Sequence, residues 1–510
     1  MQISTDVVIV GTGLAGLSLA KYLSEINPTI SILLLSKTSL DECNTYYAQG
    51  GIAVVHDFIR DSYDQHIADT LSAGKGLCDE EVVKHVITSA PARLQELLTW
   101  GVELDKNHSG ALDLGLEGGH SQHRIVHHKD ETGLELETKL IQVVQKLSNV
   151  SIQTSFFTTD LIVENEKCVG IIGFNGEQES ICINSKTTIL ATGGSGQVFS
   201  TTSNPSVATG DGIAMALRAN VAIENMHYVQ FHPTAVYEPE NNQAFLITEA
   251  IRGFGAHILN RKGERFLQKV HPDAELATRD IVSKAICDEM NIEQSENAWL
   301  DLRRLNPKEL RAKFPKITKY CKEKNWDFTT DLIPIRPAAH YQCGGISVDN
   351  IGTTSLQHLY AIGECSHTGL HGSNRLASNS LLEAVVYAHN LAEHLGKILD
   401  KIAIPNPKYV EVKYKDINYD AVLLFRNELK RQMNYEAIYG SFAAMINAHW
   451  SVLALQNKFE NRFKEYRTHP YLCETYNLIR TALLILNENK MKRSIDSFLA
   501  ERTLPAPFIN

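Results

Sequence analysis

A glycine-rich turn close to the N-terminus limits the folds that this chain can adopt. Residues 7–10, Val-Val-Ile-Val, form a short β-branched run, and Gly11, Gly13 and Gly16 follow at once. From Leu17 onward apolar residues recur with helical character. A strand, a glycine turn and a helix in this order are typical of the start of a dinucleotide-binding βαβ unit.

The spacing of the three glycines fits the backbone of a nucleotide cradle. The first permits a tight turn, the second lets a pyrophosphate approach the backbone, and the third lets the helix pack closely on the strand. The phosphates would then lie at the helix N-terminus. A second apolar run, residues 30–35, follows after the length of one crossover helix, so we expect two parallel strands. An ordinary glycine-rich turn remains the alternative, because the triplet alone is weak evidence.

The residues after the second expected strand disfavour NAD as the tightly bound dinucleotide. In NAD-binding units an acidic residue about 20 positions beyond the glycine turn binds a ribose hydroxyl. This chain has Ser36 and Lys37 there. A flavin is favoured instead by residues 44–51, where small side chains and backbone amides can lie flat against a ring system.

Two later segments repeat the pattern of a strand that ends at glycine. Residues 188–194 and 359–364 both have it, and we expect one sheet to contain them together with residues 7–10. Most of the interval between the two later segments is then an inserted domain. Beyond about Pro405 glycines nearly vanish and apolar residues recur at helical spacing, which predicts a C-terminal helical bundle.

Composition and charge exclude several classes of function. Lys and Arg total 49 against 59 Asp and Glu, so the net charge of -10 gives no electrostatic reason to expect nucleic acid or an anionic membrane as a partner. Nine cysteines without a Cys-x-x-Cys pair fit reduced thiols better than disulfides or a zinc site. No apolar run approaches about 18 residues, and no cleavable leader pattern is visible. We therefore expect a cytoplasmic protein that does not enter membranes.

Further motifs occur in a fixed order along the chain. The flavin segment reads Tyr-Ala-Gln-Gly-Gly-Ile-Ala at residues 47–53. It is followed by motifs at residues 117–121 (Glu-Gly-Gly-His-Ser), 191–194, 210–214, 230–234 (Gln-Phe-His-Pro-Thr), 248–253, 279–280, 339–345 and 374–383. Together with the glycine turn, these motifs resemble the succinate dehydrogenase and fumarate reductase flavoprotein family over most of the chain.

The resemblance implies an α/β protein with a Rossmann-like FAD-binding domain, an inserted α+β capping domain and a C-terminal helical bundle. The expected boundaries are 1–226 and 341–405 for the FAD-binding domain, 227–340 for the capping domain and 406–510 for the helical domain. Relatives from membrane-bound dehydrogenase complexes carry a histidine just before the threonine of the flavin segment and bond it covalently to the ring. Asn44 stands there in this chain, which implies non-covalent FAD.

The resemblance also implies which residues contact FAD. Including the turn glycines, they are Gly11, Thr12, Gly13, Leu14, Ala15, Gly16, Lys37, Asn44, Thr45, Tyr46, Tyr47, Ala48, Gln49, Gly50, Gly51, Asp211, Glu364, Ser380 and Leu381. Asn379 and Ser380 precede an apolar helix, and a serine in this position usually caps the helix. Aimed at the flavin, that N-terminus would favour the anionic reduced ring.

Polar residues set among apolar or glycine-containing segments predict the substrate site: His232, Thr248, Arg252, Arg279, His340 and Arg375. Arginines are rarely buried unless paired, so several that converge on a cleft require an anion, and a dicarboxylate supplies two charges. The resemblance assigns one carboxylate to His232 and Thr248 and the other to His340 and Arg375. Arg279 corresponds to the family's arginine that exchanges a proton during fumarate reduction. In amino-acid oxidation it can instead orient and neutralise a carboxylate.

One carboxylate could tell an amino acid from succinate. L-Aspartate differs from succinate by an ammonium group, and the resemblance makes Glu117 the candidate to bind it; a surface glutamate in a glycine loop is the alternative. Glu249 and Arg252 either complete the site or simply pair with each other at helical spacing. His120 and the histidines after it lack a familiar zinc spacing, so we expect no metal.

The activity implied by the resemblance is FAD-dependent oxidation of L-aspartate to iminosuccinate. The electron acceptor would be dioxygen, giving hydrogen peroxide, or fumarate. The product would enter NAD biosynthesis, with quinolinate synthase as a downstream partner. Two alternatives remain: a soluble fumarate reductase that oxidises succinate, and a non-catalytic FAD-binding protein of the same fold.

Overall fold

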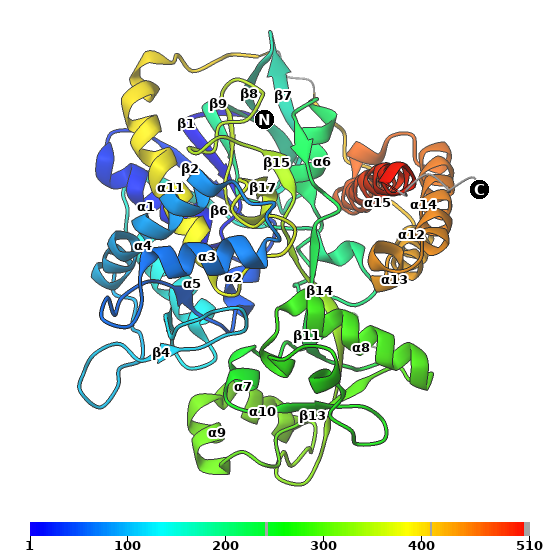
Figure 1. Ribbon diagram of the computed structural model, residues 1–510. Helices are drawn as coiled ribbons and strands as arrows, with labels where there is room; N and C mark the ends of the chain where they lie inside the picture. The colour runs from blue at the N-terminus through cyan, green and yellow to red at the C-terminus, as the bar shows by residue number, and fades with distance from the viewer. Residues whose placement is uncertain (240–242, 408–410, 504–510) are drawn as a thin grey trace.

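The computed structural model describes residues 1–239, 243–407 and 411–503. Figure 1 shows a large sheet covered by helices, a smaller sheet domain below it and a group of C-terminal helices at one side. The expected fold class is confirmed: a mainly parallel sheet with helices, an inserted α+β part and a C-terminal helical part. The residue boundaries of the three domains stay a prediction.

The central sheet has the strand order β6-β2-β1-β9-β8-β7, and β16 also pairs with β9. The strands are β1 (Gln2–Val10), β2 (Ile32–Leu35), β6 (Val150–Gln153), β7 (Phe157–Glu164), β8 (Lys167–Phe174), β9 (Ser180–Leu190) and β16 (Leu359–Ala361). β1 is parallel to β2 and β9, and β9 is parallel to β16. The three strands that end at glycine therefore lie in one sheet, as predicted.

The first strand is apolar throughout because both of its faces are covered. Val7 and Ile9 pack into the core that contains helices α1 (Leu14–Ile26) and α11 (Asn379–Ile398). Val8 and Val10 point the other way, into the core that continues to the C-terminal helices. Helices α3 (Tyr63–Ala73), α4 (Glu80–Thr99) and α5 (Thr132–Val144) complete the first layer, and α6 (Asp211–Arg218) lies on the second.

The glycine turn after β1 is fixed by contacts with protein backbone. Gly11 has a φ of 119°, and a Cβ there would lie 2.1 Å from the carbonyl oxygen of Ala191, at the end of β9. A Cβ on Gly16 would lie 2.1 Å from the carbonyl oxygen of Gly11. The first and third glycines are thus required by the tight turn and by the packing of α1, as their spacing predicted.

The inserted part is built on a second sheet in the order β11-β14-β13-β12. Its strands are β11 (Val229–Val236), β12 (His257–Leu259), β13 (Ala298–Asp301) and β14 (Ile333–Gln342), and its helices are α7 (Ala250–Gly253), α8 (Arg279–Glu293), α9 (Pro307–Lys313) and α10 (Pro315–Glu323). One small sheet has the order β3 (Ile52–Ala53), β5 (Ile125–Val126), β4 (Leu114–Gly115). A second has the order β10 (Ile223–Glu224), β15 (Gly345–Ser347), β17 (Ser366–His367). The first of them adjoins α2 (Asn44–Tyr47), the short helix of the flavin segment.

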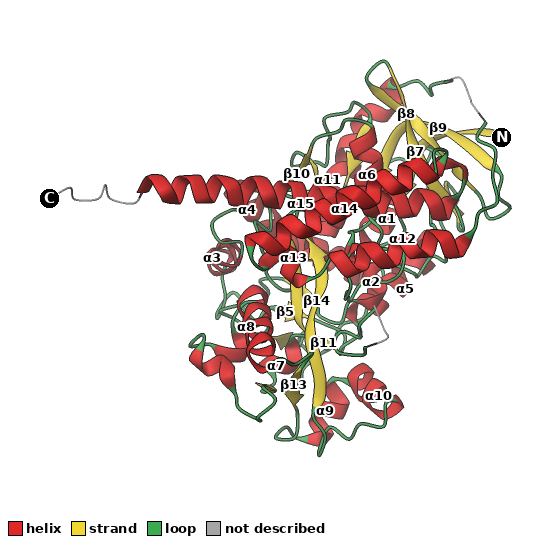
Figure 2. Ribbon diagram, turned by 90° about the vertical axis from the view of Figure 1, so that its right-hand side faces the viewer, coloured by secondary structure: helices red, strands yellow, loops and turns green. Residues whose placement is uncertain are grey.

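The C-terminal part consists of α12 (Tyr419–Gln432), α13 (Tyr435–Tyr439), α14 (Phe442–Arg462) and α15 (Pro470–Thr503). The apolar residues that predicted a helix are all buried: Leu472, Tyr476, Ile479, Leu483 and Leu486. They pack with α14 in the core that reaches the central sheet. The end of α15 extends beyond the rest of the molecule (Figure 2).

A largely buried ionic contact joins these helices to the central sheet. Lys37, after β2, lies 2.6 Å from Glu474 of α15 and 2.8 Å from Asp211 of α6. The other carboxylate oxygen of Glu474 lies 2.6 Å from Arg426 of α12. Although burial opposes ionisation, Lys37 and Arg426 lower the pKa of Glu474 to about 2. The ionised carboxylate is thus stabilised by the folded chain.

We expect Glu474 to make the folded protein sensitive to acid. The pKa of Glu474 is lower in the folded than in the unfolded chain. Its contribution to the free energy of unfolding is therefore complete above about pH 4.5 and is lost as the pH falls towards about 2. Glu474→Gln should lower the urea midpoint at pH 7, by the equivalent of a few kcal/mol, and much less at pH 3.

The exposed pair of Lys415 and Glu465 supplies the control, because exposed ion pairs contribute little. Glu465→Gln should leave the midpoint nearly unchanged at either pH. A Glu474→Gln deficit of equal size at pH 7 and pH 3 would show that ionisation is not the cause.

Candidate active site

A deep cavity opens where β1, β2, β9 and β16 end, at the edge where ligands bind in sheets of this kind. It contains about 1470 Å³ of empty space, including the part open to solvent. Fourteen of the residues predicted to contact FAD line it: Gly11, Thr12, Gly13, Leu14, Ala15, Lys37, Asn44, Thr45, Tyr47, Ala48, Asp211, Glu364, Ser380 and Leu381. The structure therefore brings together most of the predicted cofactor residues.

The remaining predicted residues lie behind this lining. Gly16 packs α1 against the turn, and Tyr46 packs edge-on against the ring of Tyr47. Gln49 donates to the carbonyl of Leu246 at 2.5 Å. Gly50 and Gly51 lie against Glu117, Ser378 and Val126. These five residues support the flavin segment.

The cavity has features that fit a dinucleotide. Gly13 is the N-cap of α1 and offers no side chain, so helix amides face the cavity without a side-chain cap. The Oδ1 atom of Asn44 is buried without a hydrogen-bond partner, while its Nδ2 donates to Glu364 at 2.6 Å. A Cβ on Gly193 would approach only Asn44 closely, at 3.8 Å, so this wall is open. An anion at the helix and a flat ring beside Asn44 would satisfy these groups.

The start of α11 differs from the prediction. Ser378, not Asn379 or Ser380, is the N-cap, and its φ of 61° is in the left-handed region. Ser380 lies inside the helix, and its hydroxyl accepts a hydrogen bond from Nη1 of Arg375. The prediction that Ser380 caps the helix is wrong, because the left-handed turn at Ser378 places the cap two residues earlier.

Lys37 and Asp211 line the cavity and form an ion pair with each other. Lys37 also donates to Thr209 at 2.7 Å and to Glu474 at 2.6 Å. Asp211 accepts from Asn477 of α15 at 2.8 Å. The cofactor end of the cavity is thus tied to the C-terminal helices.

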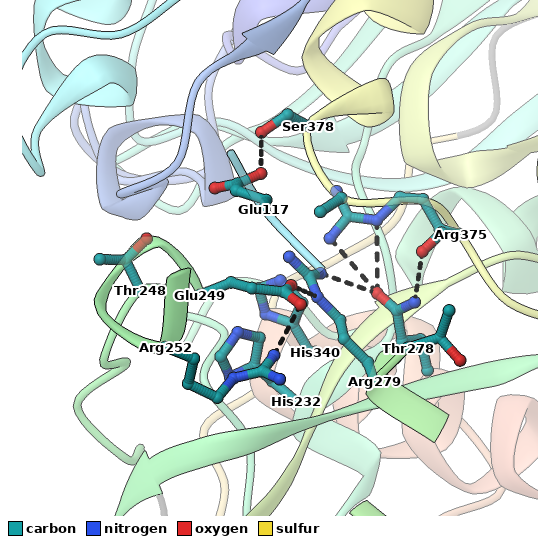
Figure 3. A network of polar contacts seen from close by, with 12 residues as sticks. Glu117, His232, Thr248, Glu249, Arg252, Thr278, Arg279, His340, Arg375 and Ser378 are labelled. Carbon is teal, nitrogen blue, oxygen red and sulfur yellow. Dashed lines mark hydrogen bonds and ion pairs between the residues drawn. The ribbon is translucent and has the colours of Figure 1, made fainter. Parts of the chain in front are cut away.

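The predicted substrate residues lie next to the cavity, around a buried ionic chain (Figure 3). Glu249, the residue before α7, lies 2.7 Å from Arg252 and 2.6 Å from Arg279. All three side chains are at least nine-tenths buried. Arg252 is held further by the carbonyl of Glu275. Glu249 and Arg252 therefore pair with each other, and the same carboxylate also fixes Arg279.

Arg375 brings a third guanidinium group to the same place from the loop before α11. Burial and the neighbouring charge of Arg279 lower its pKa to about 10, so it stays protonated at neutral pH. It lies over the ring of Tyr341, 4.3 Å from the centroid. Both Arg279 and Arg375 donate to Oε1 of Gln230, at 2.9 and 3.4 Å. The site thus has a positive centre that can receive a carboxylate.

Gln230 is a site residue that the sequence analysis did not single out. Its side-chain amide donates to Asn374 at 2.8 Å and to the carbonyl of Arg375 at 2.7 Å. Its oxygen therefore points at the two guanidinium groups. The Gln-Phe-His-Pro-Thr motif contains it, but an uncharged amide gives no sign in the sequence of the arginines that it meets in the folded chain.

Two neutral imidazoles complete the positive centre. His232 and His340 lie with ring centroids 5.0 Å apart. Burial, followed by the charge of Arg279, lowers the pKa of both well below the ordinary value. His340 contacts the hydroxyl of Ser203 at 2.7 Å through Nδ1. Thr248 is buried nearby, where its backbone N–H donates to Gln49 at 3.0 Å. These side chains can donate hydrogen bonds without adding charge.

Glu117 is buried at the other side of the three arginines. Its Oε2 accepts a hydrogen bond from Ser378 at 2.5 Å. Burial, and then the like charge of Glu249, raises its pKa, while Arg279, Ser378 and Arg375 oppose this. A surface glutamate is thus excluded, and the carboxyl group faces the site.

The loop that carries Glu117 is anchored by its own histidine. His120 contacts the carbonyl of Ala377 at 2.9 Å and Nη1 of Arg124 at 3.1 Å. Arg124 is fully buried and lies 2.8 Å from Asp61 and 2.5 Å from Asp69. Burial lowers the pKa of His120 to about 4, so it is neutral. Among the described residues no three metal-binding side chains gather to hold an ion.

Comparisons with known proteins show which chains this one resembles. Residues 6–381 match the family described as FAD binding domain. L-Aspartate oxidase of Acinetobacter baylyi is 39% identical over 494 residues, covering 94% of this chain and 90% of that protein. L-Aspartate oxidase of Neisseria meningitidis is 42% identical over 78% of each chain. The solved structure of FrdA from E. coli quinol fumarate reductase superposes with a TM-score of 0.86 at 28% identity, covering 96% of this chain and 89% of that one.

The fold and the cavity define an FAD-dependent oxidoreductase of the type shared with fumarate reductase flavoproteins. Within that class, the chain belongs to the L-aspartate oxidase family. None of the helices in the described ranges is long and apolar enough to span a membrane.

We expect FAD to be released completely when the protein is denatured. Asn44 offers an amide, which forms no bond to the flavin ring, where covalent relatives have a histidine. After acid precipitation all of the yellow colour should appear in the supernatant, with FAD added to the denatured protein as the recovery standard. Colour that stays in the pellet would contradict non-covalent binding.

Proposed function

We propose that this enzyme oxidises L-aspartate to iminosuccinate. The observation that supports the proposal is a buried carboxyl group, Glu117, opposite three guanidinium groups. The arginines are suited to carboxylates and Glu117 is suited to an ammonium group. When bound in the cavity, FAD supplies the acceptor for the hydride from the substrate α-carbon.

The two carboxylates of the substrate are divided between two sets of residues in this proposal. Arg375 and His340 bind one of them, and His232 and Thr248 bind the other. The neutral imidazoles donate hydrogen bonds, and Arg375 adds the charge.

Arg279 orients the substrate and neutralises one of its carboxylates. Its guanidinium is fixed through Nε by Glu249 and through Nη1 by Gln230. A planar group held at two edges presents its remaining N–H groups in one direction. Arg252 acts indirectly, because it keeps Glu249 in place. Glu117 accepts hydrogen bonds from the substrate ammonium group and thereby orients the α-carbon.

The electrons pass to fumarate or to dioxygen in this proposal. Fumarate is a four-carbon dicarboxylate and suits the same positive centre. Dioxygen would give hydrogen peroxide, and a quinolinate synthase would consume the iminosuccinate. The nine cysteines are all free thiols, which supports a reducing compartment such as the cytoplasm.

A soluble fumarate reductase is the alternative, which the L-aspartate oxidase relatives do not favour. The test is to add L-aspartate to the oxidised holoenzyme without oxygen, with succinate and L-glutamate as controls. Bleaching of the flavin by L-aspartate, reversed by fumarate or air, supports the proposal. Bleaching by succinate alone would favour the alternative, and no bleaching would refute both.

Glu117→Gln should reduce L-aspartate oxidation more than fumarate reduction. The amide has nearly the same shape but loses the charge that binds ammonium, so kcat/KM for L-aspartate should fall about 10²-fold. Steady-state kinetics with both substrates provide the measurement, and Glu103→Gln in an exposed loop is the control. Equal losses for both substrates would show that Glu117 does not recognise the amine.

Arg279→Lys should retain FAD and lose about 10²- to 10³-fold in kcat. A mobile ammonium group cannot replace a guanidinium held by Glu249 and Gln230. The exposed Arg261 of the same domain serves as the matched control, and Arg261→Lys should be fully active. Near-normal turnover of Arg279→Lys would refute the role assigned to the planar group.

A further inference from the structure

Ser378 is a serine at a helix N-cap that does not cap its helix. Such a serine normally accepts a hydrogen bond from an amide in the first helical turn, but here the side chain makes none. Its φ of 61° and ψ of 8° are rare for residues other than glycine. The left-handed turn directs the hydroxyl away from α11 and towards the substrate site (Figure 3).

The hydroxyl of Ser378 makes two hydrogen bonds of fixed direction. Its oxygen accepts from the backbone N–H of Gly51 at 3.1 Å, and its proton is donated to Oε2 of Glu117 at 2.5 Å. Both bonds are buried. A hydroxyl has only one proton to donate, and an ionised carboxylate accepts it more strongly than a protonated carboxyl group does, so this arrangement favours the ionised form of Glu117.

The flavin segment also confines the carboxylate. A Cβ on Gly50 would lie 2.9 Å from Oε1 of Glu117 and 3.2 Å from Oγ of Ser378. The carboxylate therefore lies directly against the backbone of the segment that contacts FAD. Any loss of the Ser378 hydroxyl leaves one buried N–H and one buried carboxylate oxygen without this partner.

The charges that face Glu117 indicate that its protonation state decides which substrate neutralises the site. Arg252, Arg279 and Arg375 carry three positive charges, and Glu249 carries one negative charge. Fumarate, with two negative charges, then balances the site if Glu117 is protonated. L-Aspartate has one net negative charge and balances the site if Glu117 is ionised. Glu364 lies on the cofactor side, where burial raises its pKa, and the two histidines are neutral.

We propose that Ser378 is a positioning and specificity residue, whose hydroxyl holds Glu117 in its ionised form and so favours L-aspartate over fumarate. The inference rests on the proposed function and deepens it. Ser378 need not touch the substrate, because it acts through the carboxylate that does. The hydrogen bond from the backbone N–H of Gly51, in the flavin segment, fixes the direction of this hydroxyl.

The electrostatics of Glu117 agree with this role. Burial, and then Glu249, raises its pKa, whereas Arg279, Ser378 and Arg375 lower it. Removal of the hydroxyl should therefore raise this pKa further. A group with a raised pKa is ionised only at higher pH, so L-aspartate oxidation would begin at higher pH in the variant.

The test uses the FAD-loaded Ser378→Gly enzyme, because glycine keeps the left-handed turn while the side chain with its hydroxyl is removed. The pH profiles of kcat/KM are measured for L-aspartate oxidation and for fumarate reduction by a reduced dye. For L-aspartate we expect a loss of about 10-fold at neutral pH, mainly through KM, and an acid limb shifted upward by about one pH unit. Fumarate reduction should be unchanged or faster.

Two further variants separate the effect of the Ser378 hydroxyl from a general effect on the structure. Ser283→Ala, in α8, removes another buried hydroxyl, which donates to the backbone carbonyl of Phe231 in β11, and should move neither profile. Ser378→Ala should shift the acid limb in the same direction as Ser378→Gly. An unmoved acid limb, equal losses for both substrates, or loss of FAD in both Ser378 variants would overturn the proposal. Failure of the proposed function would be distinguishable from failure of this inference, because L-aspartate would then not reduce the flavin of the unmodified enzyme.

Discussion

The active site depends on one buried carboxylate between two guanidinium groups. Glu249 lies 2.7 Å from Arg252 and 2.6 Å from Arg279, and all three are removed from water. Breaking such a buried pair leaves an uncompensated charge and costs about 3–5 kcal/mol. Because Glu249 balances only one guanidinium, positive charge remains for an anionic substrate. The same contact joins α7 to α8 and thus fixes the site within the inserted part.

The cavity is lined by the part built on the central sheet and by the inserted part, and two of its lining residues bind the C-terminal helices. The glycine turn and α11 belong to the part built on the central sheet. Gln49 of the same part forms hydrogen bonds with Leu246 and Thr248 of the inserted part. At the other end, Lys37 is bound to Glu474 of the C-terminal helices. Cofactor binding and the packing of the three parts therefore share the same side chains. The C-terminal helices, which supply no predicted catalytic residue, still contribute to the cofactor end.

Several features were predictable because they rest on local patterns. The run Val7–Val10 and the glycines after it required a buried strand and a tight turn, and both are present. The position of Ser380 was predicted wrongly, because serine before an apolar helix usually caps it and nothing nearby in sequence indicates the left-handed turn at Ser378. Gln230 was missed because an uncharged amide gives no signal until two arginines are found beside it.

The sequence by itself determined the strand and glycine turn, the helical C-terminal part and the residue types from which the site is made. These follow from apolar periodicity and backbone freedom, which act over a few residues. Only the tertiary structure decided which polar groups meet. Ser378 reaches Glu117 across 261 residues, and Lys37 reaches Glu474 across 437. Partners so distant are chosen by the packing of whole elements, and the pKa of a buried carboxyl group depends on the charges that this packing places around it.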